Sequence, residues 1–234
     1  MPKIWVAIPA YSGQISVQTA ESLHLELYES LSRKWPMVVV FHQQNPMIHY
    51  VRNAMIMRFL ESDFTDLVFV DNDVGFEKGT LCKLVSYPVD IVGAVYPHRN
   101  DPITYPVRYI HERTELTGGT EPGTGNILEV DGCPAGCLRI TRSCLERLIE
   151  MHPDLHYQDM EGNKTYALFD FVRKDGEFLG EDWAFCKLAR ESGFKIWIDP
   201  EVEMNHTGTK VFRGNLGKSL RERDDPEAMM NNIM

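Results

Sequence analysis

The sequence predicts an α/β fold: a mostly parallel central sheet flanked by helices, with a smaller antiparallel part in the second half of the chain. Short apolar runs alternate with helix-like patterns over residues 1–100, the order expected when helices join parallel strands. These runs are hydrophobic throughout rather than at every second residue, which is typical of strands buried on both faces. The second half interrupts the alternation with shorter apolar runs between Pro- and Gly-rich stretches.

The elements of the first half are bounded by local signals. Pro9 ends the first apolar run, and Trp35-Pro36 ends the first helical pattern, because proline cannot continue a helix. The expected strands are residues 4–8, 37–41, 66–70 and 90–95, and the expected helices are residues 14–33, 48–62 and 78–86. Sheets of this kind bind ligands beyond the carboxyl ends of their strands, so the residues after each strand are candidates for a site.

The second half begins with residues 101–126, which are rich in Pro, Gly and Thr and predict a loop or hairpin tip. Within this segment we expect residues 112–126 to form a mobile flap. We expect one domain over residues 1–214, followed by a charged tail or peripheral helix over residues 215–234. The expected strands are residues 127–130, 137–140, 166–172 and 195–198, and the expected helices are residues 142–151 and 180–192.

The acidic composition limits the classes of ligand. The chain of 234 residues has a formal net charge of −10, with 43% hydrophobic and 25% charged residues. This balance argues against a nucleic-acid partner, because nucleic-acid binders present a basic patch to the phosphate backbone. It is compatible with a small anionic ligand whose charge is neutralised by a bound divalent ion.

Cysteine usage and hydropathy indicate a soluble, cytoplasmic protein. The five cysteines form no C-x-x-C pair, and an odd number without zinc-like spacing is typical of reduced thiols. No apolar run approaches the ~20 residues that cross a bilayer. The N-terminal residues lack the pattern of a signal peptide, so we expect no membrane span.

The first candidate site is the stretch LVFVDNDVGF at residues 67–76, in which Asp71 and Asp73 directly follow a buried strand. Three interpretations are open. The carboxylates could cap a turn. They could bind Mg²⁺ or Mn²⁺ that also bridges a diphosphate. They could share a proton, as paired carboxylates do in hydrolases. This stretch alone does not choose between them.

Three further features bear on that choice. Tyr11 follows the first strand, where it could stack on a base or simply pack at a turn. Glu181 and Asp182 open a helix whose dipole would keep them ionised, which suits a general base, although acidic first turns are common for charge reasons alone. His206 stands beside Thr-Gly after a short strand, and could bind a divalent ion or be structural.

Together, these motifs resemble the small GT-A-fold glycosyltransferases, and they are most similar to the family-2-like enzymes of bacteria, phages and large viruses. The resemblance spans residues 3–212. It rests on PAY at 9–11, VRN at 51–53, FVDNDVGF at 69–76, DIVGAVYP at 90–97, GEDWAFCKLARESGFKIWIDP at 180–200 and NHTG at 205–208. Asp-x-Asp alone is a weak signal, whereas its combination with the later Gly-Glu-Asp-x-x-Phe and His-x-Gly motifs is specific.

The resemblance implies a metal-dependent glycosyltransferase that moves a sugar from a UDP- or GDP-linked donor to a hydroxyl acceptor such as a glycan. It implies Mn²⁺ or Mg²⁺ held by Asp71, Asp73 and His206, with Asp73 as the firmer aspartate ligand. Asp182 matches the general base of inverting members. The implied donor contacts are Pro9, Ala10, Tyr11, Arg52, Asp71, Asn72, Ala135 and Gly136, and the implied acceptor contacts are Glu181 and Trp183.

Several alternatives stay open. The chain has no C-terminal Q-x-x-R-W element, which counts against a processive polysaccharide synthase and leaves open whether configuration is inverted or retained. A sugar-nucleotide pyrophosphorylase-like nucleotidyltransferase would carry a glycine-rich, basic loop after the first strand, whereas residues 7–14 read AIPAYSGQ. A glycosidase that pairs Asp73 with Asp182, and a catalytically idle sugar-binding module of the same fold, are the remaining alternatives.

Overall fold

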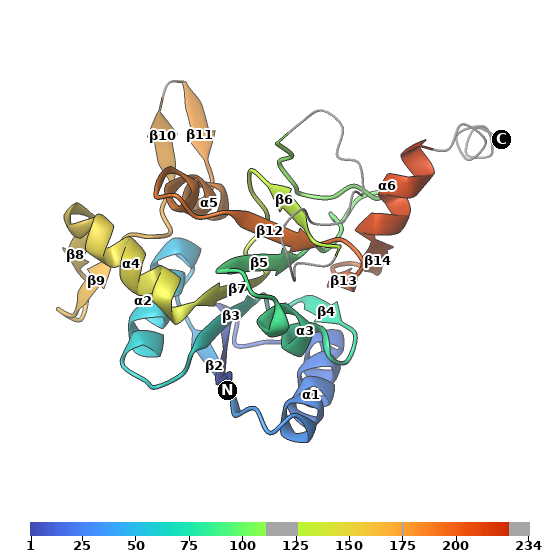
Figure 1. The fold of residues 1–234 in the computed structure, drawn as a ribbon, viewed down its shortest axis with the longest axis horizontal. Coiled ribbons are helices and arrows are strands. Elements are labelled where there is room, and N and C mark those ends of the chain that lie inside the picture. Colours follow the sequence, from blue (N-terminus) through green and yellow to red (C-terminus); the bar gives the residue numbers. More distant parts are fainter. Residues whose placement is uncertain (111–125, 175, 225–234) are drawn as a thin grey trace.

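The computed structural model describes residues 1–110, 126–174 and 176–224, and it is built around one seven-stranded sheet (Figure 1). The strand order is β2-β1-β3-β7-β5-β12-β6. Five of these strands run in one direction, while β7 and β6 run antiparallel to their neighbours. The expected α/β fold class, with a mostly parallel central sheet and a smaller antiparallel part, is therefore confirmed. The strands are β1 (Ile4–Ala10), β2 (Met37–Gln43), β3 (Asp66–Val70), β5 (Ile91–Ala94), β6 (Leu128–Val130), β7 (Cys137–Thr141) and β12 (Ile196–Asp199).

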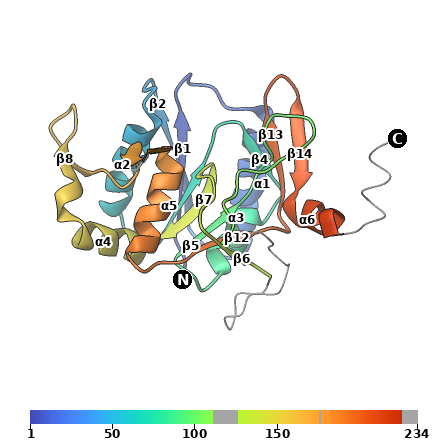
Figure 2. The same cartoon turned by 90° about the horizontal axis from the view of Figure 1, so that it is seen from above.

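Helices cover both faces of this sheet and create two hydrophobic cores (Figure 2). Along β3, Leu67 and Phe69 point into one core and Val68 and Val70 into the other, because successive side chains of a strand point to opposite faces. One core is closed by α2 (Ile48–Leu60), α4 (Arg142–Met151) and α5 (Glu181–Glu191), and the other by α1 (Val17–Ser32) and α3 (Thr80–Ser86). Burial on both faces explains why the strand sequences are apolar throughout.

A three-stranded antiparallel sheet, β14-β13-β4, stands beside the main sheet. Its strand β4 (Val74–Phe76) directly follows Asp71-Asn72-Asp73 and pairs with β13 (Glu203–Thr207), so that His206 lies opposite Val74. The third strand, β14 (Val211–Asn215), leads into α6 (Leu216–Asp224), whose Leu216 and Leu220 are buried. Through this pairing, the small sheet brings His206 next to the end of β3.

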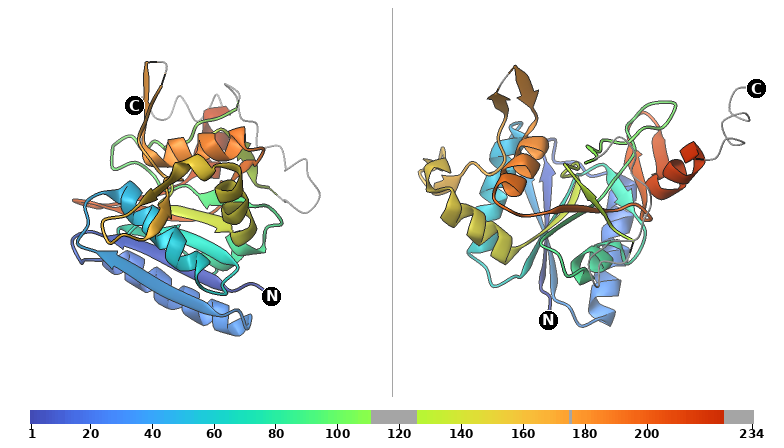
Figure 3. Two further views of the ribbon diagram at one scale, coloured as in Figure 1. Left: turned by 90° about the vertical axis from the view of Figure 1, so that its left-hand side faces the viewer. Right: turned by 45° about the horizontal axis from the view of Figure 1, so that its top comes forward.

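Two short hairpins extend from the α5 side of the molecule (Figure 3). They are formed by β8 (His156–Gln158) with β9 (Lys164–Tyr166), and by β10 (Val172–Lys174) with β11 (Glu177–Leu179); a 3₁₀ turn over Pro153–Leu155 precedes β8. The second hairpin runs directly into α5, so it fixes the start of the helix that carries Glu181 and Asp182.

The expected strand at residues 166–172 is wrong. The chain leaves β9 at Tyr166 and enters β10 only at Val172. Between them, the Asn53 side chain takes the place of a neighbouring strand: its amide donates to the Phe169 carbonyl (2.8 Å) and its oxygen accepts from the Phe169 N–H (2.9 Å). The apolar residues of this stretch are buried as a loop, since a side chain satisfies the backbone that a strand partner would otherwise satisfy.

Other expectations can be compared directly. All five cysteines are buried free thiols. Within the described ranges, no helix has the length and apolar character needed to cross a bilayer. Apart from residue 126, the expected flap over residues 112–126 lies outside the described residues.

Candidate functional site

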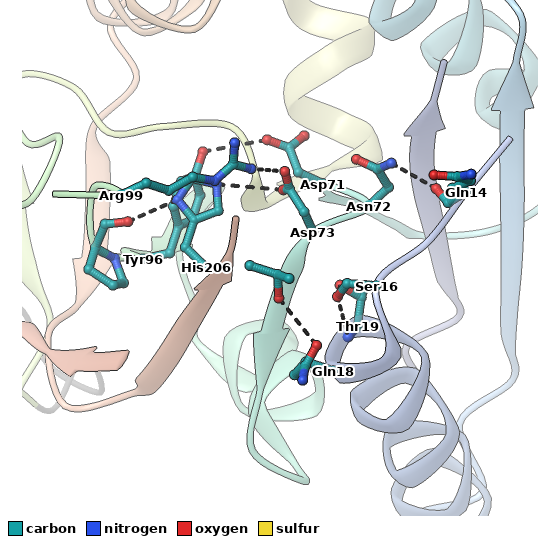
Figure 4. A network of polar contacts seen from close by, with 12 residues as sticks. Gln14, Ser16, Gln18, Thr19, Asp71, Asn72, Asp73, Tyr96, Arg99 and His206 are labelled. Carbon is teal, nitrogen blue, oxygen red and sulfur yellow. Dashed lines mark hydrogen bonds and ion pairs between the residues drawn. The ribbon is translucent and has the colours of Figure 1, made fainter. Parts of the chain in front are cut away.

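A cleft of about 400 Å³ opens at the carboxyl ends of β1 and β3. Of the residues expected at a site, it is lined by Pro9, Tyr11, Asp71, Asn72, Asp73 and His206. Of the lining residues that the sequence did not single out, Tyr96 and Arg99 carry polar side chains and follow the end of β5. The Asp71-Asn72-Asp73 turn lies in the middle of this group (Figure 4).

Asp71 is held by a buried arginine. The Arg52 side chain is only 3% exposed, and it donates from Nη2 to Asp71 Oδ1 at 2.9 Å and from Nη1 to Glu181 Oε1 at 2.6 Å. Its guanidinium carbon lies 5.6 Å from the Phe69 ring centroid and 5.8 Å from that of Phe169. Arg52 therefore lies beneath the cleft and joins the Asp71 turn to the start of α5.

Gly136 gives Asp71 the room it occupies. The Gly136 carbonyl accepts a hydrogen bond from the Asp71 N–H at 3.0 Å. A Cβ at position 136 would lie 2.5 Å from Asp71 Oδ2 and 2.6 Å from the Tyr96 hydroxyl, so a larger residue would displace these groups. Burial raises the pKa of Tyr96, which keeps the phenol protonated and able to donate to Asp71 Oδ2 at 3.5 Å.

Asp73 faces two nitrogen-bearing side chains (Figure 4). The Arg99 guanidinium forms an ion pair with Asp73 Oδ2. His206 Nε2 lies 3.6 Å from Asp73 Oδ1. The Asp73 carbonyl accepts from the Thr207 N–H at 2.8 Å, which locks the turn to β13.

His206 is oriented as a neutral imidazole whose Nε2 lone pair is available to a metal ion. Its Nδ1 lies 2.9 Å from the Pro97 carbonyl, and a carbonyl only accepts, so Nδ1 carries the proton and Nε2 is left with its lone pair toward Asp73. Burial lowers the pKa of His206, which favours this neutral form. A backbone carbonyl that accepts a hydrogen bond from one ring nitrogen is a usual partner of a metal-binding histidine.

Asp73 and His206 are the two side chains best placed to bind a divalent ion. Their carboxylate oxygen and imidazole nitrogen are the ligand types that Mn²⁺ accepts, and they face each other. Asp71 is turned toward Arg52 and Tyr96 instead. Accordingly, the part of the chain that the structure describes contains no preformed group of three His, Cys, Asp or Glu side chains suited to a metal.

Asp182 lies at the N-terminus of α5, partly buried, and accepts a hydrogen bond from the Trp183 N–H at 2.8 Å. Its pKa is raised above the usual value, first by burial and then by the neighbouring Glu181 carboxylate. Arg52 and the Trp183 N–H act in the opposite direction but do not prevail. Burial and Glu181 therefore act against the ionised form that the helix dipole favours.

The remaining expected donor contacts differ in position. Tyr11 is 61% exposed at the rim of the cleft, whereas Ala10 is buried within β1. Asn72 donates to the Gln14 carbonyl at 2.7 Å and so fixes the loop between β1 and α1. Ala135 is buried in the core next to α5 and does not line the cleft.

Trp183 lies away from the cleft. Its ring packs against Gly132, where a Cβ would lie 2.7 Å from the ring, and the Arg108 guanidinium stacks at 5.0 Å from the ring centroid. Trp183 and Arg108 line a separate cavity of about 510 Å³. The two residues expected to contact an acceptor therefore lie in different surroundings: Glu181 pairs with Arg52, whereas Trp183 lines the second cavity.

Sequence reasoning missed Tyr96 and Arg99 as site residues. A signal was present, because DIVGAVYPHRND continues past the end of a buried parallel strand, and such ends line the ligand edge of a sheet. The pairing of Arg99 with Asp73 depends on how the chain after β5 folds back, which no local pattern encodes.

Comparison with solved structures finds the fold elsewhere. The protein A197 from STIV matches with a TM-score of 0.50 and 18% identity, over 88% of this chain and 86% of that chain. A glycosyltransferase involved in the glycosylation of the major capsid of PBCV-1 matches with a TM-score of 0.35 and 12% identity, over 64% of this chain and 66% of that one. S. aureus TarS 1-349 matches with a TM-score of 0.47 and 14% identity, over 84% of this chain and 58% of that one.

The first of these likenesses shows a shared fold and nothing finer, and the other two are too distant to support a conclusion. Neither the protein-family models nor the curated proteins match this chain. The function must therefore be argued from the site itself.

Proposed function

We propose that this protein is a glycosyltransferase that moves a sugar from a nucleotide-diphosphate-sugar to a hydroxyl acceptor. One observation carries the proposal: Arg52 hydrogen-bonds to both Asp71 and Glu181, and Glu181 is the neighbour of Asp182. Through Arg52, the turn that carries Asp71 and Asp73 is therefore joined to the helix start that carries Asp182, the carboxylate suited to a general base.

The donor would lie in the 400 Å³ cleft. Pro9 and the exposed ring of Tyr11 would frame the base, because an aromatic face at the rim can stack on it. Asp73 and His206 would hold Mn²⁺ or Mg²⁺, with Asp71 close by. Once bound, the ion supplies positive charge that offsets the diphosphate and favours its departure.

Asp182 would act as the base of an inverting transfer. It takes the proton from the acceptor hydroxyl while that oxygen bonds to the anomeric carbon, and the bond from that carbon to the diphosphate oxygen breaks with its electron pair. A carboxylate with a raised pKa is a stronger base than an exposed one. Glu181, neutralised by Arg52, positions the helix start rather than the acceptor.

The alternatives fit less well. A nucleotidyltransferase would need several cations around its phosphates, whereas Arg99 is the single Lys or Arg among the described residues that line the cleft. A glycosidase pair of Asp73 and Asp182 would leave His206, whose Nε2 lies 3.6 Å from Asp73 Oδ1, without a role, whereas metal binding uses both residues. A sugar-binding module would share the donor cleft and would differ only in turnover.

A thermal-shift screen tests the proposal. UDP- and GDP-linked sugars are added with Mn²⁺, and matched samples receive EDTA. A donor that occupies the cleft raises the melting temperature by mass action, and chelation removes that rise. A protein that responds to no nucleotide-sugar, with Mn²⁺ present and the fold intact, would contradict the proposal.

A further inference from the structure

Arg99 is the feature of the cleft that the proposed function leaves unexplained. Its side chain is 42% exposed, and its guanidinium pairs with Asp73 Oδ2 at the turn where a divalent ion would bind. Among the described residues lining the cleft, no other Lys or Arg is present, and Arg52 lies buried beneath it. Arg99 is therefore the one cation of this set that can reach a ligand from the solvent side.

The stem of Arg99 packs against the neighbouring hairpin, whereas its guanidinium is held only through Asp73 among the described residues. A Cβ at Gly208 would lie 2.9 Å from Arg99 Cδ, so the absence of a side chain there lets the arginine stem lie against β13–β14. The loop around Arg99 is attached to the same hairpin by the contact of Pro97 with His206 and by the ion pair of Asp101 with Lys210. Within the part of the chain that the structure describes, Asp73 is the ion-pair partner of the Arg99 guanidinium.

A divalent ion and Arg99 compete for the same carboxylate. An ion held by Asp73 and His206 would bring a second positive charge to the carboxylate that pairs with the guanidinium, and like charges at short range repel. The diphosphate that accompanies the ion offers a better partner, because a guanidinium binds phosphate oxygens through two parallel hydrogen bonds. Because its stem is fixed, the Arg99 guanidinium can move from Asp73 to the diphosphate without a movement of the loop.

We propose that Arg99 is an exchangeable cation, which balances Asp73 and moves onto the diphosphate of the nucleotide-sugar when a divalent ion binds that aspartate. This inference rests on the proposed function. During transfer, the acceptor oxygen bonds to the anomeric carbon while the bond from that carbon to the diphosphate breaks. The electron pair of the broken bond goes to the β-phosphate oxygen, and Arg99 donates hydrogen bonds to that oxygen. The acceptor proton goes to Asp182, so charge and atoms balance.

Titration calorimetry tests the exchange without turnover. Mn²⁺ alone, and then UDP and GDP at saturating Mn²⁺, are titrated into the wild type, Arg99→Ala and Arg99→Lys. Loss of the competing cation makes Mn²⁺ binding to Arg99→Ala about 3- to 10-fold tighter. Loss of the phosphate contact makes its nucleoside-diphosphate binding about 10-fold weaker, with Arg99→Lys in between.

Two further variants sharpen the test. Gly208→Ala keeps the charge but pushes the Arg99 stem away, so it also binds Mn²⁺ more tightly than the wild type does. Lys78→Ala removes an exposed, ion-paired cation that does not line the cleft, and it binds both ligands like the wild type. Circular dichroism confirms that each variant is folded before it is compared.

The outcomes separate the two proposals. If the wild type binds a nucleoside diphosphate and Arg99→Ala binds it equally well, the exchange is wrong and the proposed function stands. If Arg99→Ala binds Mn²⁺ no more tightly than the wild type, the exchange is also wrong. If the wild type binds neither nucleotide with Mn²⁺ present, both proposals fail.

Discussion

Arg52 Nη2 donates a hydrogen bond of 2.9 Å to Asp71 Oδ1, although the two residues lie 19 positions apart, on α2 and after β3. The same guanidinium reaches Glu181, 129 positions away. A single buried side chain thus connects the Asp71-Asn72-Asp73 turn to the helix that carries Asp182, the candidate base. The site therefore depends on Arg52 to stay intact.

Replacing Arg52 by Met should destabilise the protein. The Arg52 side chain is 3% exposed, and its removal leaves the Asp71 and Glu181 carboxylates close together without their cation. Breaking a buried pair from one side costs about 3 kcal/mol in free energy of unfolding. Urea denaturation measures the loss. Arg33→Met, which removes an exposed arginine paired with Glu29, is the control and should change stability by less than about 1 kcal/mol. Equal stability of the two variants would contradict this role for Arg52.

Replacing Gly136 by Ala should disturb Asp71 specifically. The new Cβ would meet Asp71 Oδ2 at 2.5 Å and the Tyr96 hydroxyl at 2.6 Å, so the carboxylate must move. We expect a loss of about 1–3 kcal/mol in unfolding free energy, the usual cost of overpacking. Nucleoside-diphosphate affinity with Mn²⁺ should fall as well. A variant with wild-type stability and affinity would show that the Asp71 position is not fixed by Gly136.

Asp182→Asn should stabilise the protein at neutral pH. The pKa of Asp182 is raised by burial and by Glu181, so the folded protein binds this proton more tightly than the unfolded chain does. Ionisation of Asp182 therefore costs stability above its folded pKa, and it costs none below the unfolded value near 3.8. The variant should be more stable than the wild type at pH 7, and the difference should vanish as the pH falls toward 4. A difference that grows on acidification would contradict the sign.

Asn53→Ala should cost about 3 kcal/mol, because it leaves the buried Phe169 N–H and carbonyl without their partner. The measurement is again the free energy of unfolding in urea. Asn163→Ala, at an exposed turn, provides the matched control. If both asparagines prove equally dispensable, the loop at Phe169 is held by other contacts.

Much of the fold could be predicted from the sequence. The strand at 66–70 and the helix at 142–151 have the expected bounds, because their apolar patterns and flanking residues are local signals. The strand expected at 166–172 failed because Asn53, which is far away in the sequence, satisfies the backbone of Phe169. A periodic pattern indicates burial, but it does not identify the partner of a buried backbone.

The candidate site was predicted unevenly for the same reason. Asp71, Asp73 and His206 were expected together, and the structure places all three at one cleft because β4 pairs with β13. Arg99 was missed, and Trp183 was expected at an acceptor site but packs against Gly132 beside a different cavity. Motif order predicts which strand ends meet, whereas the direction of a side chain depends on contacts that form only in the folded chain.

The most direct test of the account measures the release of nucleoside diphosphate from the donor identified by thermal shift, with Mn²⁺ and an acceptor present. The wild type should release it, and EDTA should stop the release. Asp182→Asn should keep donor affinity while its rate falls by about 10²- to 10⁴-fold, the usual contribution of a general base. Wild-type turnover by Asp182→Asn, or full activity in EDTA, would contradict the account.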